Sequence, residues 1–410
     1  MKRKRIFIGT SEIGNLIYLW GEALRTMGHE VYTVTRKKNK FYSRSLYSEI
    51  IPYDNNIKIL NDFLKEPLQG LLANGDQLMK IRSLLVDHDI YIFLFGHSIL
   101  GDLDDLILLK KLGKKIICIF LGNDLRVKAG YDLHCKYNKV LHQIPLYSRF
   151  GLNEKLRKIR LAELHSDAIY GAPNLMALSL KAYFQINIAI NINKIHCNIP
   201  NRDVPVIIHA PSNPVIKGSK IIIKALNDLK EEGINFEFVL LENTDNSIVL
   251  QNLSNADIAV DQLYSEGPAT FALEAMAAGC AVLCGNRPDT VPYPPDRPCI
   301  DVDPDSMKDK LKELIINKNL RTELASKGRD YVCKWHSPEA SASRLLEGLT
   351  RSRNDDYDYY PSLFINKFEQ SVHEPLNDES KQLNMSVLKT MNNINEEQWE
   401  SLKVRGLIPD

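Results

Sequence analysis

Two glutamates stand eight positions apart in a segment that is otherwise apolar and helix-forming. The segment is EGPATFALEAMAAG, residues 266–279, with Glu266 before a Gly-Pro turn and Glu274 inside the predicted helix. Glu274 suits the two hydroxyls of a ribose, as the acidic residue of dinucleotide sites does, and Glu266 suits the hydroxyls of a sugar. The structural alternative is that Glu266 complements the helix start and Glu274 lies on a solvated face. The apolar neighbours of Glu274 argue against that alternative, because a buried carboxylate without partners is costly.

The helix start between the two glutamates suits an anion. Pro268 is favoured at a first helical position, where its missing N–H costs nothing, and Gly267 lets the backbone approach a ligand closely. The N–H groups of Ala269, Thr270 and Phe271, with the positive end of the helix dipole, then form a phosphate site. A phosphate held between a ribose and a sugar describes a nucleotide-sugar.

Alternating apolar runs and helix-period segments must position this site. RIFIG, HEVYTVT, IYIFLFG and KKIICIFLG are strand-like runs in the first half of the chain, and VIIHAPS, FEFVLLE, ADIAVDQL and CAVLCGN follow in the second. Such alternation indicates βαβ units, and therefore an α/β protein with parallel sheets covered on both faces. We predict two doubly wound, Rossmann-like domains, residues 1–200 and 201–350, with a hinge at 197–205 and a cleft where the carboxyl ends of the two sheets face each other.

Composition narrows the class of protein. The 52 Lys and Arg residues balance 51 Asp and Glu residues, so we expect no nucleic-acid partner that is recognised through bulk charge. Seven irregularly spaced cysteines fit a reducing cytosol, and no run approaches the ~18 apolar residues of a membrane-spanning helix. Residues 351–410, rich in Asn, Asp, Tyr and Ser, form a tail whose order the sequence leaves open, with two helical patterns around 379–404.

No metal site is expected. DVD at residues 301–303 resembles a metal-binding triplet, but it lies in a proline-rich stretch and is predicted to be a surface turn. DLDD at residues 102–105 is predicted to be the acidic first turn of a helix.

The chain resembles the retaining glycosyltransferases of the GT-B fold, family 4 (group 1). The specific part of the resemblance is EGPATFALEAMAAG, and HAPSNPVIKGS, ADIAVDQLYSEG and GHSILGDLDDLILLKKLGKKIICIFLGNDLR support it over roughly residues 1–350. It implies that the first domain holds the acceptor and the second the nucleotide-sugar, without a further cofactor. It also implies that the helix at residues 337–349 returns to the first domain.

The resemblance assigns roles in the donor site. It places Glu266 at the donor sugar, Glu274 at the ribose and Lys217, which stands just before a glycine, at the diphosphate. The structural alternative for Lys217 is a solvated lysine at a helix start. The family's arginine five positions before this lysine is replaced here by Ser212, so donor affinity would rest more on the helix N–H groups and on Ser212 or Asn213.

The first domain supplies weaker candidates. GTSEIGN after the first strand resembles the family's glycine-bearing loop and nominates Gly14 and Asn15, with an ordinary strand-to-helix turn as the alternative. His97 ends a very apolar strand, and the resemblance implies a hydrogen bond to the donor sugar, whereas a lone histidine there is more often structural. Asn123 and Asp124 in LGNDLR are expected to line the acceptor pocket.

We therefore predict a cytoplasmic, metal-independent hexosyltransferase. The resemblance implies that it retains the anomeric configuration and acts on a glycan or lipid-linked acceptor in cell-surface polysaccharide synthesis. The alternatives are a catalytically silent GT-B module that binds a partner, and a GT-B nucleotide-sugar epimerase. Residues 153–164 carry Lys155, Arg157, Lys158 and Arg160 in an amphipathic pattern. They suggest peripheral contact with the inner face of a membrane, and the alternative is a solvated helix face.

Overall fold

The computed structural model divides into two compact units. Among the described residues, one unit comprises those up to Ile186 and those from Ala342 onward, and the other comprises Asn187–Ser341. The predicted division after residue 200 therefore falls inside the second unit. The structure describes residues 2–36, 47–51, 58–60, 65–126, 151–173, 175–199, 202–264, 267–285, 296–361, 376–392 and 394–410.

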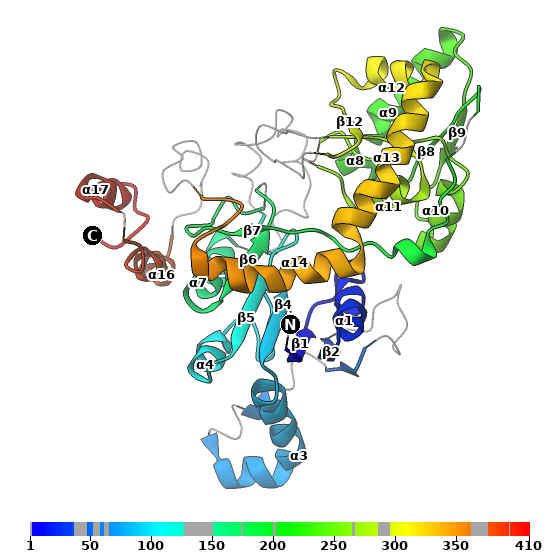
Figure 1. Cartoon of the computed structure of the whole chain (residues 1–410). Helices are drawn as coiled ribbons and strands as arrows, with labels where there is room; N and C mark the ends of the chain where they lie inside the picture. The colour runs from blue at the N-terminus through cyan, green and yellow to red at the C-terminus, as the bar shows by residue number, and fades with distance from the viewer. Residues whose placement is uncertain are drawn as a thin grey trace. The chain divides into compact units, whose positions relative to one another are not determined.

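A seven-stranded parallel sheet forms the centre of the first unit, in the order β3-β2-β1-β4-β5-β6-β7 (Figure 1). The order reverses between β1 and β4, and such a reversal is where open α/β sheets bind ligands at the carboxyl ends of their strands. The strands are β1 (Arg5–Gly9), β2 (Glu30–Thr35), β3 (Glu49–Ile50), β4 (Ile90–Leu94), β5 (Lys115–Ile119), β6 (Ala168–Gly171) and β7 (Phe184–Gln185). The helices are α1 (Leu16–Thr26), α3 (Pro67–Val86), α4 (Leu106–Lys111), α7 (Leu152–His165), α14 (Pro338–Arg351), η4 (Ser352–Asn354), α16 (Asp378–Leu388) and α17 (Glu396–Val404).

A five-stranded parallel sheet forms the centre of the second unit, in the order β12-β11-β10-β8-β9. Its reversal lies between β8 and β10. The strands are β8 (Val206–His209), β9 (Glu237–Leu240), β10 (Ile258–Val260), β11 (Ala281–Cys284) and β12 (Cys299–Asp301). The helices are η3 (Ile192–Lys194), α8 (Pro214–Lys217), α9 (Ser219–Glu231), α10 (Asn246–Leu253), α11 (Thr270–Ala278), α12 (Met307–Ile316) and α13 (Lys318–His336). The two parallel sheets confirm the predicted α/β class.

The continuous apolar runs of the second sheet follow from burial on both faces. Successive strand residues point to opposite faces. Ile208 accordingly packs in a core with residues of α11 and α13, whereas its neighbour Ile207 packs in a second core with residues of α9 and α12. Both residues are completely buried, which explains why these strands read as unbroken apolar runs rather than alternating ones.

Helix α11 ends at a glycine that no other residue can replace easily. Gly279 has φ +91°, in the left-handed region, and the N–H of Cys280 donates to Ala275 O at 2.9 Å, which closes the helix. A Cβ on Gly279 would lie 2.6 Å from Asn198 O. The N–H of Asn198 in turn donates to Ala278 O at 3.0 Å, so the end of α11 is fixed to the chain at residue 198.

The tail is folded where the structure describes it. The helical patterns predicted around residues 379–404 correspond to α16 and α17. They enclose a small core of Leu388, Leu402 and Ile408 with partly buried Trp399. Asn395 caps α17 through a reciprocal hydrogen-bond pair with Gln398.

The basic residues of α7 do not form a membrane-facing surface, which corrects that hypothesis. Lys155, Lys158 and Arg160 are buried. Arg160 donates to Asn384 of α16 at 2.6 Å and to Glu163 at 2.6 Å. Arg157 pairs with acidic side chains that include Glu379 at 3.0 Å. Arg157 and Arg160 thus bind the tail. An amphipathic pattern does not reveal such contacts between distant parts of the sequence. No described helix is long and apolar enough to span a membrane.

The second half of α14 packs against β6 through a glycine. The Tyr170 hydroxyl donates to Arg344 O at 2.5 Å and accepts from the N–H of Gly348 at 3.1 Å. A Cβ on Gly348 would overlap the Tyr170 hydroxyl oxygen. The contact therefore needs a residue without a side chain at this position.

Gly348→Ala should lower the free energy of unfolding by about 1–3 kcal/mol, because an added methyl group has no room against Tyr170. Urea-induced unfolding measures this change. Gly75→Ala is the matched control in α3, where an added Cβ meets nothing within 4 Å and the helix should gain up to ~1 kcal/mol. Equal effects of the two substitutions would contradict the packing argument.

Candidate functional site

A buried histidine joins the three elements that meet at the reversal of the second sheet. His209 ends β8 and is completely buried. Its Nδ1 lies 2.7 Å from Val260 O at the end of β10, and its Nε2 lies 2.8 Å from the Ser219 hydroxyl at the start of α9. A carbonyl can only accept, so Nδ1–H donates to Val260 and the Ser219 hydroxyl donates to Nε2. Burial lowers the pKa of His209, which keeps the imidazole neutral in this role.

Lys217 lies beside this histidine and is not a solvated lysine. It is 8 % exposed, and its ammonium group forms an ion pair with Asp261 and donates to Gln262 Oε1 at 3.2 Å. Asp261 and Gln262 directly follow β10. Gly218, at φ +77°, turns the chain between α8 and α9 and so directs Lys217 towards these residues.

The segment before α11 is tied to the same strand ends. The N–H of Gly267, at φ +83°, donates to Gly285 O at 2.8 Å, and Gln262 Nε2 donates to Gly267 O at 2.9 Å. The N–H of Ala269 donates to Asp261 Oδ2 at 3.2 Å. These bonds hold the turn against the carboxyl ends of β10 and β11.

The helix begins later than predicted. Ala269 is the N-cap, with extended backbone angles of φ −86° and ψ −179°, and Thr270 is the first helical residue. Pro268 is therefore not the first helical position, because the turn must first return the backbone to Gly285. The first turn leaves the N–H groups of Thr270 and Phe271 without an acceptor inside the helix, at its positive end.

Glu274 lies one turn further along and is partly buried. Both of its carboxyl oxygens accept from Asn246 Nδ2 of α10, at 3.1 and 3.3 Å. Burial is the main cause that raises the pKa of Glu274 to about 7; the hydrogen bond from Asn246 lowers this pKa, and the negative charge of Asp261 adds to the rise. A carboxyl group that is half-charged near neutrality can both donate and accept hydrogen bonds.

Ser212 and Asn213, which are also predicted to bind the nucleotide-sugar, take no part in the hydrogen bonds described above. Ser212 is exposed. The Asn213 side-chain oxygen caps α8 by accepting from Val215 N and Ile216 N, at 3.1 and 3.2 Å, so that oxygen already has a structural task. Glu266 lies outside the described residues.

The candidates of the first unit follow β1, β4 and β5, three neighbouring strands, so they share one edge of that sheet. Gly14 and Asn15 both have positive φ, at +60° and +64°, and Asn15 is the N-cap residue of α1. Glu12, which the sequence did not single out, accepts from Ile17 N at 3.3 Å. Burial raises the pKa of Glu12 to about 7.

His97 belongs to a charged cluster at the end of β4. Its Nδ1 lies 2.7 Å from Asp102 Oδ1. The same oxygen lies 3.6 Å from Lys158 Nζ, and Lys158 Nζ lies 3.0 Å from Glu154. A carboxylate at Nδ1 orients an imidazole ring.

The residues after β5 have mainly a structural task. Asp124 is completely buried and accepts from Leu121 N and Gly122 N, at 3.1 and 2.7 Å. Its pKa is raised by burial. Asn123 Oδ1 accepts from Arg126 at 3.3 Å, so Asp124 shapes the loop that carries Asn123.

The acidic triplets have local partners. Asp301 pairs with Arg297 at 2.8 Å, and Asp303 Oδ1 accepts from Ser306 N at 2.8 Å. Asp105 is buried, accepts from Ile99 N at 3.0 Å and is the N-cap residue of α4. DLDD therefore precedes this helix and does not form its first turn. Within the described ranges, no group of three or more His, Cys, Asp or Glu side chains could hold a metal ion.

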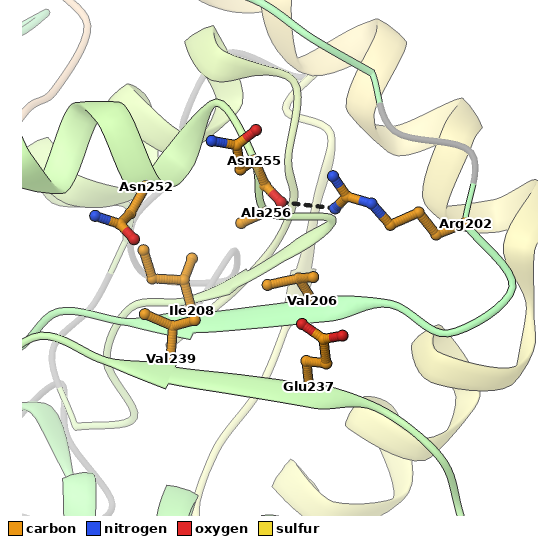
Figure 2. A pocket seen from close by; sticks show the side chains of 8 residues that line it. All are labelled: Arg202, Val206, Ile208, Glu237, Val239, Asn252, Asn255 and Ala256. Atoms are coloured by element: carbon orange, nitrogen blue, oxygen red, sulfur yellow. Dashed lines mark hydrogen bonds between the residues drawn. The ribbon is translucent and has the colours of Figure 1, made fainter.

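A separate hollow of about 360 Å³ lies at the opposite end of β8 and β9. Figure 2 shows its apolar floor and its polar rim, where Arg202 donates to Asn255 O at 2.6 Å. Val206 and Glu237, the first residues of β8 and β9, contribute to it. The hollow is therefore distinct from the carboxyl end of β10, where Lys217 contacts Asp261 and Gln262.

Comparisons with known proteins support the architecture. No family model matches the chain, and no curated protein matches its sequence. Among solved structures, a sucrose-phosphate synthase from Thermosynechococcus elongatus is similar over 86% of this chain and 100% of its own, with 15% identity and a TM-score of 0.56. HepE of Anabaena, in complex with UDP-glucose, is similar over 85% of this chain and 100% of its own, with 12% identity and a TM-score of 0.53. An α-glucosyltransferase in complex with UDP and DNA is similar over 85% of this chain and 100% of its own, with 14% identity and a TM-score of 0.52. The chain thus has the fold of these GT-B enzymes.

Glu274→Gln should stabilise the protein at pH 8 by about 1–3 kcal/mol, and the gain should vanish towards pH 4.5. The raised pKa means that the native state binds the proton more tightly, so the wild type loses stability as the pH rises from 4.5 through about 7. The neutral amide keeps the hydrogen bond from Asn246 without that loss. Urea unfolding at pH 4.5, 6 and 8 measures the difference, and a gain that did not change with pH would contradict the assignment.

Proposed function

We propose that this chain is a glycosyltransferase that moves a sugar from a nucleotide-sugar donor to an acceptor. The observation that carries the proposal is a buried Lys217 beside the start of α11, at the reversal of the second sheet of a GT-B fold. An ammonium group and a helix N-terminus at this position form an anion site of the kind that binds phosphate. The donor complexes described for structural neighbours, which contain UDP-glucose or UDP, agree with this chemistry.

In the proposed donor complex, the diphosphate binds Lys217 and the N–H groups of Thr270 and Phe271. Glu274 binds the ribose hydroxyls, and Glu266 binds the sugar. Ser212 and the amide nitrogen of Asn213 add polar contacts where the family's arginine is absent.

The proposed reaction breaks the bond between the anomeric carbon and the phosphate oxygen. Negative charge then develops on the departing phosphate, and fixed positive groups stabilise it most when they need no reorganisation. Lys217 and the α11 N–H groups supply such charge, so we propose a metal-independent reaction. By resemblance to family 4, it retains the anomeric configuration, transfers a hexose and involves His97 at the donor sugar.

The acceptor is proposed to bind at the first unit, near the loops that carry Gly14, Asn15, Asn123 and Asp124. A glycan or lipid-linked acceptor in cell-surface polysaccharide synthesis, on the cytoplasmic side, follows from the family resemblance. The near-neutral net charge of the chain does not exclude a nucleic-acid acceptor, because one protein of this fold is described in complex with DNA.

A catalytically silent binding module is the second candidate, and a specific feature favours it. Ser212 removes one cation from the donor site, and Lys217 already has a carboxylate partner in Asp261. Such a module would bind a nucleotide-sugar weakly and transfer nothing.

A thermal-shift screen against UDP-, GDP-, ADP- and CMP-sugars should identify at least one stabilising ligand. A ligand at about 100 times its Kd adds about 2.7 kcal/mol to the free energy of unfolding. A chain that ignores all four classes would contradict the proposal, whereas binding without donor hydrolysis or transfer would favour the silent module.

Lys217→Met should weaken binding of the identified donor about 10- to 150-fold, as expected for the loss of one charge-assisted hydrogen bond. Glu274→Ala should weaken it about tenfold, through the ribose. Lys224→Met is the matched control, since Lys224 pairs with Asp228 on an exposed face of α9. Isothermal titration calorimetry measures all three variants, and full donor affinity in both site variants would refute the site.

A further inference from the structure

The proposed phosphate site already contains an anion. Asp261 forms an ion pair with Lys217 through Oδ1 and accepts from the N–H of Ala269 through Oδ2 at 3.2 Å. One carboxylate thus joins the two kinds of donor, an ammonium group and a backbone amide before a helix start, that a phosphate would need. The sequence analysis did not single out Asp261.

Burial makes this contact strong. Asp261 is 1 % exposed, and water cannot easily take the place of either partner. Lys217 has a further oxygen partner in Gln262, whose amide nitrogen donates to Gly267. The ammonium group has three N–H donors, so it can bind a phosphate oxygen while it remains held by Gln262.

We infer that Asp261 sets the anion affinity of this site, because its carboxylate competes with an incoming phosphate for Lys217 and Ala269. The identity of the ligand as a nucleotide diphosphate rests on the proposed function, whereas the competition does not. Two anions on one ammonium group repel each other strongly where water is scarce. A phosphate must therefore displace the Asp261 side chain or bind against its charge.

The competition makes the site selective. A diphosphate can engage Lys217 and, through its second phosphate, the N–H groups of Thr270 and Phe271. A single small anion can only exchange places with Asp261 and gains little. The same carboxylate also acts on Glu274, whose pKa its negative charge raises, so both proposed ends of the donor site respond to Asp261.

Binding of inorganic pyrophosphate, measured by isothermal titration calorimetry, tests this inference directly. Asp261→Asn removes the charge and keeps one acceptor oxygen, which can serve Lys217 or Ala269, while the amide nitrogen takes the place of the other oxygen. It should bind pyrophosphate about tenfold tighter or more than the wild type. The same affinity or a weaker one, in a protein whose unfolding remains cooperative, would overturn the inference.

Asp257→Asn is the matched control. Asp257 is also buried, precedes the same strand and pairs with a cation, Arg202, at 2.8 Å. Its loss should leave pyrophosphate affinity unchanged, and a gain equal to that of Asp261→Asn would overturn the inference. If Asp261→Asn does not fold, Asp261→Ser replaces it, with the same expectation.

The two proposals fail in different ways. Tighter pyrophosphate binding by Asp261→Asn, with no nucleotide-sugar bound by either protein, keeps the role of Asp261 and rejects the glycosyltransferase. Donor binding by the wild type without any gain in Asp261→Asn rejects the role of Asp261 alone.

Discussion

A buried ammonium group must have an anion beside it, and much of the second unit is arranged around this requirement. Lys217 meets it with Asp261. Removing one partner from such a pair leaves an uncompensated buried charge and strongly destabilises the protein, although the intact pair adds little to its stability. The surrounding hydrogen bonds of His209, Gln262 and Gly267 therefore fix strand ends, turn and helix start in one arrangement.

A similar solution occurs in the first unit. There the start of α1 meets a carboxyl group of the chain, Glu12, which accepts from Ile17 N. In both units an acidic side chain thus lies near the positive end of a helix that follows a sheet reversal. The pKa of Glu12 is raised to about 7, so this group changes its charge close to neutral pH.

The sequence predicts the framework well because the framework depends on local pattern. Apolar runs such as VIIH and AVLC predict buried parallel strands, and Ile207 and Ile208 show why, as they enter different cores. Polar residues directly after such runs mark the strand ends, and Asp261, directly after β10, carries this signal. The signal was available for Asp261, but it does not say which polar residues contact one another.

Features that depend on distant contacts were not predictable in this way. Helix α11 begins at Thr270 because Gly267 is bound to Gly285, a contact that a preference for Pro268 at a first helical position does not include. The burial of Arg160 depends on Asn384, more than two hundred positions later. An amphipathic pattern records which residues are charged but not which distant segment covers them.

Helix α11 is held at both ends, by Gly267 at its approach and by Gly279 at its close. Its nine residues span about 13 Å at 1.5 Å each. The helix can therefore neither shift along its axis nor rotate without breaking the contacts at one of its ends. The positions of its leading amides are therefore determined partly at its far end. A variant altered only at Gly279 would then lose affinity for the proposed donor although every proposed binding residue was unchanged.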